Sequence, residues 1–369
     1  MVDQTAARTG PDAGVPRSPD DVDCVWLTDV LGPAVGPSAR VADVRVGPVG
    51  IGIGLLGQLR RYTLRWEGGD GPASVVAKFP AAGDKSRALA EALAMYPREV
   101  AFYRDLGAAT PLSVDCYHAA VDESTHDFVL VLEDMVGATT VDQLAGCPVE
   151  RAEQVVTALA DHHARHWDEA GLDRAPWLER FVEQGLPGQI AAAVRVCWPG
   201  IRARFADELA PGTLALGDGL ADALPRIADR LSRRPVTLSH GDLRLDNVFF
   251  ADGNDGVRLC DWQLTGRSRG MRDVAYFLTQ SLTPGDRSAA ELDLVARYVG
   301  RLASQGVRGY DEDAAWEDYR TATLLGFAYA IVALGGLDQD DDRSAALPRA
   351  MLSRSVQAMA DLGCSLPER

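Results

Sequence analysis

The sequence of 369 residues predicts an α+β fold with two lobes: an antiparallel sheet plus a helix in the N-terminal lobe and a mainly helical C-terminal lobe. Period-two alternation and glycine-rich turns are typical of the first part of the chain, and helical patterns punctuated by prolines fill much of the remainder. A continuous apolar strand at 128–132 lies between them. We expect four parts: a disordered leader at 1–20, the N-terminal lobe at 21–132, a hinge at 133–137 and the C-terminal lobe at 138–369.

Ser18-Pro19-Asp20-Asp21 predicts the start of the first helix. Further on, glycines at 52, 54 and 57 have the spacing GxGxxG, which by itself fits a dinucleotide-binding turn as well as a phosphate-binding hairpin. The residues after them alternate at period two, with Tyr62, Leu64 and Trp66 on one face, which indicates a strand and not a helix. We therefore predict that Gly52, Gly54 and Gly57 lie in a hairpin whose backbone N–H groups approach phosphate oxygens.

The run at 73–80 predicts a strand with Lys78 near its end. Lysine occurs only at positions 78 and 85 in a chain with 37 Lys plus Arg, so a compact ammonium at Lys78 indicates pairing with α- and β-phosphates. The alternative is a surface lysine on an edge strand. Glu99 follows on a helix that begins near Pro97 and is the natural partner of Lys78, unless it is one charge on a solvated helix face.

Glu133 to Val136 follow the apolar strand at 128–132 and form the predicted hinge. In a two-lobed nucleotide-binding arrangement the hinge backbone receives the base by hydrogen bonds, which makes Glu133 and Met135 nucleotide-binding candidates. In the C-terminal lobe, prolines at 176, 187, 199 and 211 predict breaks between helices, and the apolar run at 322–337 predicts a buried helix, because it is shorter than the roughly 20 residues that span a bilayer. Aromatic residues at 167, 177, 181 and 198 are available to line an acceptor pocket, although such residues more often pack in a core.

The segment from His240 to Asn247 carries the strongest chemical signal. Asp242 and Asn247 are five positions apart, and Asp261 follows after strands expected at 248–250 and 257–260. Phosphoryl transfer requires an aspartate that orients the attacking hydroxyl and two oxygen ligands for magnesium, and these three residues supply that set. Each of them alone is also a common turn former, but the order and spacing of all three predict a phosphotransferase.

These residues resemble the aminoglycoside phosphotransferase and choline kinase-like superfamily, and are most similar to its actinobacterial phosphotransferase-like, ecdysteroid-kinase-like and hydroxyacyl-CoA kinase-like groups. The resemblance rests on HGDLRLDNVFF, on the Asp261-Trp262-Gln263 segment and on GMRDVAYFL from residue 270, and covers the chain from about residue 22. It implies a bilobal, protein-kinase-like fold, Asp242 as catalytic base, Asn247 and Asp261 as magnesium ligands, and His240 and Asp273 as structural supports of the catalytic loop.

Two departures bear on the substrate. Gly241 stands where regulated protein kinases have arginine, and Trp262-Gln263 stands in place of Phe-Gly, with no Ala-Pro-Glu segment downstream. A protein substrate is therefore disfavoured. The prediction is an ATP-dependent kinase of a small-molecule hydroxyl, with Mg²⁺ and with GTP as the alternative donor. A nucleotide-binding pseudokinase and a hydroxyacyl-CoA kinase remain open, as does the oligomeric state.

Composition limits the partners. A net charge of −16 disfavours nucleic-acid binding, which needs basic patches, and no run of apolar residues predicts a membrane span or a signal peptide. Acidic surface clusters would suit a polycationic acceptor, but solubility explains them more simply. The six cysteines show no paired spacing, which predicts reduced thiols and a cytoplasmic location. The pair His162 and His166 has metal-ligand spacing without the glutamate of a zinc protease, and packing of His163 in a core is the simpler interpretation.

Overall fold

The computed structural model describes residues 14–49, 57–251, 256–336 and 342–368, so Gly52 and Gly54 lie outside the described residues. The chain forms two compact units, the first made of residues 1–139 with 249–264 and the second of residues 140–248 with 265–369. The first unit thus includes 249–264 in addition to the predicted N-terminal lobe. Backbone hydrogen bonds explain this, because Leu259 pairs with Leu112 and Val114, and Phe250 pairs with Thr139.

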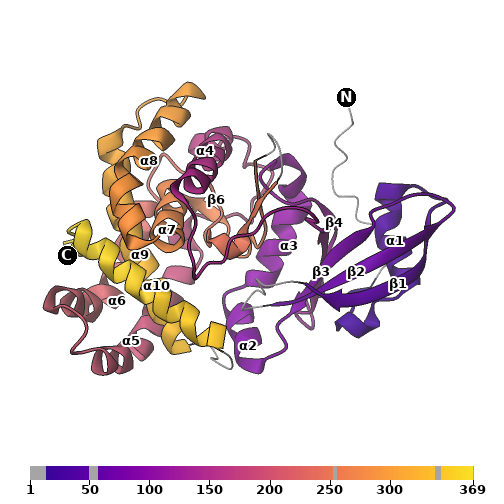
Figure 1. Cartoon of the computed structure of the whole chain (residues 1–369), viewed down its shortest axis with the longest axis horizontal. Helices are drawn as coiled ribbons and strands as arrows, with labels where there is room; N and C mark the ends of the chain where they lie inside the picture. The colour runs from indigo at the N-terminus through magenta and orange to yellow at the C-terminus, as the bar shows by residue number, and fades with distance from the viewer. Residues whose placement is uncertain (1–13, 50–56, 252–255, 337–341, 369) are drawn as a thin grey trace. The chain divides into compact units, whose positions relative to one another are not determined.

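The first unit is built on an antiparallel five-stranded sheet in the order β1-β2-β3-β5-β4 (Figure 1). Its elements are α1 (Cys24–Val35), β1 (Arg40–Pro48), β2 (Gly57–Glu67), β3 (Ser74–Pro80), α2 (Asp84–Ala92), α3 (Met95–Asp105), β4 (Cys116–Val121) and β5 (Phe128–Glu133), followed by the small hairpin of β7 (Val248–Phe250) and β8 (Val257–Leu259). The alternation predicted for β2 holds, since Tyr62 and Leu64 are buried and Thr63 and Arg65 are exposed. The predicted antiparallel sheet with a helix is confirmed.

The start of α1 differs from the prediction. Pro19–Asp21 form a separate 3₁₀ turn, with the Asp21 carboxylate accepting from the Ser18 backbone N–H at 3.0 Å. The helix itself begins at Cys24, because the Asp23 side chain accepts from the Trp26 backbone N–H at 2.8 Å and caps the first turn. Val15, within the predicted leader, packs against the core beneath α1 and the sheet.

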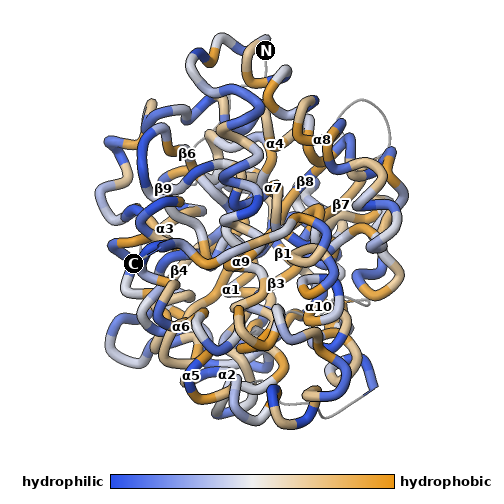
Figure 2. The backbone as a smooth tube through the Cα atoms, turned by 90° about the vertical axis from the view of Figure 1, so that its left-hand side faces the viewer, coloured by the Kyte–Doolittle hydropathy of each residue, from blue (hydrophilic) through white to orange (hydrophobic). Residues whose placement is uncertain are grey.

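The second unit is mainly helical, as predicted. Its elements are α4 (Val149–Arg165), α5 (Leu186–Arg204), α6 (Pro211–Leu231), β6 (Thr237–Ser239), β9 (Gly266–Ser268), α7 (Met271–Ser281), α8 (Pro284–Ser304), α9 (Glu312–Gly336) and α10 (Asp342–Asp361). Helix α9 is the central one, with buried residues on all sides, and the tube in Figure 2 is apolar along much of it. Within the described ranges no helix is long and apolar enough to cross a membrane.

Proline 199 does not break a helix, which corrects the prediction. Helix α5 continues through Pro199, and the apolar face of Ile190, Val194 and Trp198 is buried. The Trp198 indole N–H also donates to Asp218 at 2.8 Å, so Trp198 is anchored within the helical unit. Tertiary packing therefore outweighs the missing backbone hydrogen bond, whereas Pro187 and Pro211 lie in first helical turns, where proline is tolerated.

Candidate active site

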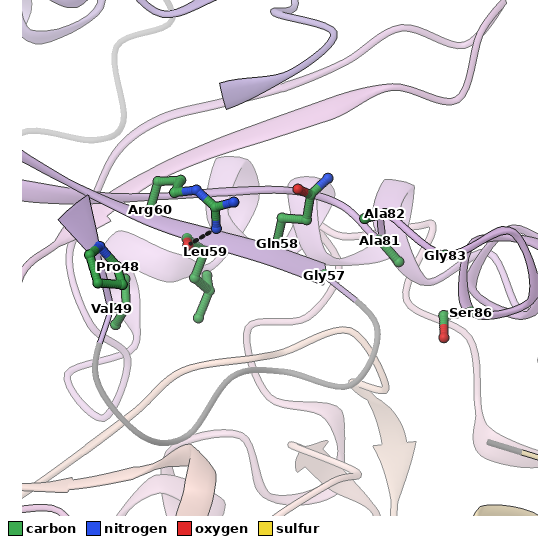
Figure 3. Close-up of a pocket in the computed structure, with 10 residues that line it drawn as sticks. All are labelled: Pro48, Val49, Gly57, Gln58, Leu59, Arg60, Ala81, Ala82, Gly83 and Ser86. Atoms are coloured by element: carbon green, nitrogen blue, oxygen red, sulfur yellow. Dashed lines mark hydrogen bonds between the residues drawn. The ribbon is translucent and has the colours of Figure 1, made fainter. Parts of the chain in front are cut away.

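In the first unit, a pocket of about 320 Å³ lies at the end of β1 and the start of its antiparallel partner β2. Figure 3 shows its lining residues, which are Pro48, Val49, Gly57, Gln58, Leu59, Arg60, Ala81, Ala82, Gly83 and Ser86. The Gln58 side chain donates to the carbonyl of Pro80 at 3.0 Å and ties β2 to the end of β3. The glycine-containing connection therefore joins two paired strands, as predicted, and not a strand and a helix.

Gly57 has a steric role beside Lys78. A Cβ atom at position 57 would lie 3.1 Å from Cε of Lys78 and 3.2 Å from the carbonyl oxygen of Phe79. In the antiparallel register Lys78 pairs with Leu59 and Gly57 with Pro80, and the Lys78 side chain extends along β2 as far as Gly57. The absence of a side chain at Gly57 thus leaves room for the Lys78 stem.

Lys78, Glu99 and Asp261 form a buried cluster in the first unit. The Lys78 Nζ donates to both carboxylate oxygens of Glu99, at 3.0 and 2.8 Å, and to Oδ1 of Asp261 at 2.7 Å. All three side chains are under a tenth exposed. The predicted pair of Lys78 and Glu99 is present, and the alternatives of a surface lysine and a solvated glutamate are excluded. The bond to Asp261 was not anticipated.

The cluster carries two carboxylates around one ammonium. Burial alone would lower the pKa of Lys78, but the negative charges of Asp261 and Glu99 outweigh it and raise the pKa, so the lysine stays charged. Burial and the charge of the Asp261 carboxylate together raise the pKa of Glu99 to about 7, against the lowering effect of Lys78. An additional cation near the carboxylates would relieve this excess of negative charge.

Helix α3 positions Asp261 through its neighbours. The fully buried Trp262 stacks on Phe102 of α3, with ring centroids 4.1 Å apart and planes within 9°. Arg98, also on α3, donates to the carbonyl of Gln263 at 3.1 Å. Asp261 itself adopts a left-handed backbone conformation (φ 68°), which a non-glycine residue takes only when its surroundings enforce it. The tryptophan that replaces the kinase phenylalanine thus fixes the strained aspartate to α3.

The segment predicted as a hinge, 133–137, lies within the first unit and is held by Asp134, a residue that the sequence did not single out. Both carboxylate oxygens of Asp134 accept from the Arg61 guanidinium, at 2.7 and 2.9 Å, and Ser74 Oγ donates at 2.6 Å. Glu133 ends β5, and its backbone N–H donates to the carbonyl of Asp115 at 2.9 Å. Met135, two residues on, is partly buried. The Asp134 contacts hold the backbone of Glu133 and Met135 against β2 and β3.

In the second unit, Asp273 organises the segment that contains Asp242. Its carboxylate accepts from Ser239 Oγ at 2.8 Å and from the backbone N–H groups of His240 and Gly241 at 2.7 and 2.8 Å. His163 lies 3.3 Å away on the other side. Although burial acts in the opposite direction, these hydrogen bonds and positive charges hold the pKa of Asp273 well below its usual value. Asp273 is thus a fully ionised anchor, which fits the supporting role that the resemblance implied.

His163, which the sequence predicted to be a core residue, is buried, but its ring nitrogens face polar partners. Its Nδ1 lies 2.8 Å from the hydroxyl of Tyr298 while Nε2 faces Asp273. His240 is also fully buried, and its Nδ1 is 3.3 Å from the backbone nitrogen of Asp242. A polar core therefore supports the loop from behind. Spacing in the sequence could not identify it, because α4 and α7 are far apart in the chain.

Asp242 lies at the edge of this polar core, with its side chain 15% exposed. Asn247 donates from Nδ2 to the carbonyl of Asp242 at 2.8 Å, which closes the loop and fixes the orientation of the amide. Arg244 lies 3.7 Å from the Asp242 carboxylate and 2.7 Å from that of Asp246. Asp246 is in turn held by Arg343 of α10 at 3.0 Å.

The donor set fits magnesium in part. Asp261 offers a carboxylate, and because Nδ2 of Asn247 is committed to Asp242, its Oδ1 is the atom suited to a hard cation. No group of three or more His, Cys, Asp or Glu side chains in the described part of the chain forms a metal site. Mg²⁺ usually takes only one or two protein oxygens and keeps water and substrate phosphate oxygens in its remaining positions, so each of these oxygens is a suitable ligand by its chemistry.

Comparisons with known proteins agree with this geometry. Residues 171–306 match the model of the ecdysteroid kinase-like family. No curated protein matches significantly. Among solved structures, the chain is similar to a candidate aminoglycoside phosphotransferase from Ralstonia eutropha (TM-score 0.53, 17% identity, 87% of this chain and 93% of that one).

Two further solved structures share the fold. Choline kinase from Cryptosporidium parvum has a TM-score of 0.53 at 10% identity, covering 88% of this chain and 92% of that one. The GDP complex of aminoglycoside 2'-phosphotransferase-IIIa has a TM-score of 0.53 at 13% identity, covering 91% of this chain and 99% of that one. The chain therefore has the fold of the aminoglycoside phosphotransferase and choline kinase-like superfamily.

Proposed function

We propose that this protein is a magnesium- and ATP-dependent phosphotransferase that phosphorylates a hydroxyl group of a small molecule. The observation that carries the proposal is the buried cluster in which Lys78 is held between Glu99 and Asp261. Burying three charges costs several kcal/mol, and a structural core could be built more cheaply from apolar residues. A pre-positioned ammonium beside a metal-type carboxylate is suited to phosphate oxygens.

Each residue has a distinct role in this proposal. Lys78 contacts the α- and β-phosphates, and the pocket beside Gly57 together with the hinge at Glu133 and Met135 receives the rest of the nucleotide. Asn247 and Asp261 are the residues that would hold Mg²⁺, and the ion would supply neutralisation of the charge on the transferred group. Asp242 orients the acceptor hydroxyl and accepts its proton as the oxygen attacks. Asp273 and His240 keep the Asp242 loop in place.

Two features support ordinary catalysis over a purely nucleotide-binding role. Asp242 is partly exposed, as is Asp246, whereas the neighbouring His240, Leu243 and Leu245 are buried. Its loop is held by hydrogen bonds from Ser239 and from the backbone N–H groups of His240 and Gly241 to the ionised Asp273. GDP is bound in one of the similar structures, so GTP is an alternative donor. The six cysteines are free, which supports the proposed cytoplasmic location.

The test is ADP release from Mg-ATP by wild type and by Asp242→Asn, across hydroxyacyl-CoAs, aminoglycosides, sterols and amino alcohols. Acceptor-dependent release should fall by at least about 100-fold in the variant, because proton transfer typically contributes that much. ATP affinity, measured by calorimetry, should stay within about threefold. Equal turnover by Asp242→Asn would reject the base assignment, and ATP binding without turnover of any acceptor would favour the pseudokinase.

A further inference from the structure

Arg272, the second residue of α7, is a buried cation whose hydrogen bonds are incomplete. Its side chain is among the largest fully buried ones, at 1% exposure. The guanidinium carbon lies 4.1 Å from the ring centroid of Phe181, and Nη2 donates to the hydroxyl of Tyr329 at 3.0 Å. Its Nε and Nη1 are buried and have no hydrogen-bond partner in the described part of the chain. A buried N–H group without an acceptor costs about 1 to 3 kcal/mol.

Other buried arginines of the same unit are fully paired. Arg287 contacts the carboxylates of Glu291 and Asp361, and Arg354 donates to backbone carbonyls that include those of Gln143 and Leu144. Within the described residues, Arg272 is the arginine with two unpartnered nitrogens, and it forms no ion pair with a carboxylate. Among the described residues, the hydroxyl of Tyr329 is the acceptor that the fold supplies to Arg272, and the Asp273 carboxylate interacts with its charge without forming an ion pair.

Two tyrosines connect the surroundings of Arg272 with those of Asp242. Tyr329, its hydrogen-bond partner, is only partly buried and packs edge-on against Tyr276, with ring centroids 5.4 Å apart. Burial raises the pKa of Tyr276 well above its usual value, and the charge of the nearby Asp242 carboxylate adds to this. Asp242 also contributes to the raised pKa of Tyr329, after burial. Arg272 is thus hydrogen-bonded to Tyr329, Tyr329 packs against Tyr276, and both tyrosines lie within the field of the Asp242 carboxylate in the second unit.

We propose that the acceptor carries an oxyanion, a carboxylate or a phosphate, in addition to the hydroxyl that is phosphorylated, and that this oxyanion binds Arg272 and Tyr329. The inference rests on the proposed function. The unpartnered N–H groups of Arg272 donate to the oxyanion. Because the Tyr329 oxygen already accepts from Arg272, its own hydrogen is available as a further donor. The acceptor hydroxyl then lies at Asp242.

This inference separates the chain from kinases of cationic acceptors. A buried guanidinium near the catalytic aspartate would repel an ammonium group, and in a low-dielectric setting that repulsion is weakly screened. The net charge of −16 does not oppose an anionic acceptor, since charges on the surface are screened beyond about 8 to 10 Å at physiological salt. Local charge, and not total charge, selects the acceptor.

The kinetic test compares hydroxy acids with their neutral amides and amino analogues. In wild type, kcat/KM should favour the acid over its amide by about 100-fold, as expected for hydrogen bonds to a charged group. Arg272→Met should reduce that ratio to about one, and Tyr329→Phe should reduce it about tenfold. Tyr319→Phe, on the same helix but bonded to Glu291, is the matched control and should keep the ratio. A structural arginine would lower both rates equally, and an unchanged acid-to-amide ratio in Arg272→Met would overturn the inference.

A second measurement does not need turnover. Sulfate is titrated calorimetrically into full-length wild type and the three variants, each saturated with ADP and Mg²⁺ to fill sites for phosphate. Wild type and Tyr319→Phe should bind sulfate at least tenfold more tightly than Arg272→Met and Tyr329→Phe. Equal affinities in all four proteins would overturn the inference even if phosphoryl transfer is established by Asp242→Asn. An Arg272-dependent sulfate site without turnover of any acceptor would support the oxyanion site and reject the proposed function.

Discussion

Lys78 and Asp261 are 183 positions apart in the chain, and their side chains form an ion pair of 2.7 Å. With Glu99 on the other side, the ammonium is the only cation of this buried cluster among the described residues. Removal of this ammonium would leave two buried carboxylates without a counterion.

Lys78→Met should destabilise the protein by about 3 to 5 kcal/mol, because two buried carboxylates lose their counterion. Lys78→Met combined with Glu99→Gln and Asp261→Asn removes all the charges and should recover most of that loss. Urea unfolding followed by circular dichroism measures both. Additive destabilisation in the triple variant would show that the three groups do not interact.

Trp262→Ala should cost about 3 to 5 kcal/mol, because a fully buried aromatic side chain is lost and a cavity remains against Phe102. Trp262→Phe keeps a ring for stacking and should cost much less. ADP release should fall in the alanine variant as Asp261 loses its support. If both variants unfold at the same urea concentration as wild type, the stack does not hold Asp261.

Asp273→Asn should cost about 2 to 4 kcal/mol, since the amide nitrogen would face N–H groups that now donate to a carboxylate oxygen. Ser239→Ala removes one donor of the set and should cost about 1 kcal/mol. Chemical denaturation of the two variants and wild type gives the comparison. A larger loss in Ser239→Ala than in Asp273→Asn would contradict the anchoring role.

His118 on β4 should make the protein less stable in acid. Burial, together with the charge of Arg104, lowers the pKa of His118 to about 4, whereas an unfolded histidine titrates near 6.5. Above pH 6.5 the residue is neutral in both states. Between pH 6.5 and 4 only the unfolded chain takes up the proton, so stability falls as pH falls, by up to about 3 kcal/mol.

Unfolding free energies of His118→Gln at pH 7, 6, 5 and 4.5 measure this contribution. The variant should lose less stability than wild type over that range. His126→Asn removes an exposed histidine and serves as the control, with the wild-type pH dependence expected. Parallel curves for wild type and His118→Gln would exclude the histidine as the cause.

Local sequence patterns predicted the antiparallel sheet, the hairpin position of Gly57 and the pairing of Lys78 with Glu99. These depend on alternation and on the order of chemical groups along the chain. The bond from Asp261 to Lys78 could not be predicted, because it depends on a left-handed backbone at Asp261 and on Trp262 packing against α3. The continuation of α5 through Pro199 likewise depends on tertiary packing and could not be predicted from the local sequence.

The burial of the Arg272 side chain could not be predicted from the sequence. In the sequence Arg272 is one arginine among many, next to an aspartate at a helix start, and nothing in its neighbours shows that its guanidinium is buried. Its partners Phe181 and Tyr329 come from distant parts of the chain. The oxyanion site could therefore be inferred only after side-chain burial and hydrogen bonding were known.

The first compact unit is assembled from two separate pieces of chain, 1–139 and 249–264. During synthesis on the ribosome, residues 1–139 emerge long before Asp261, so Lys78 and Glu99 must wait for more than a hundred further residues before the third member of their cluster exists. A fragment that ends near residue 139 would lack Trp262. The ring of Phe102 on α3, which Trp262 covers in the complete unit, would then be exposed. Nascent chains halted at that point should therefore attract chaperones, and a separately expressed first unit would need residues 249–264 grafted onto its end.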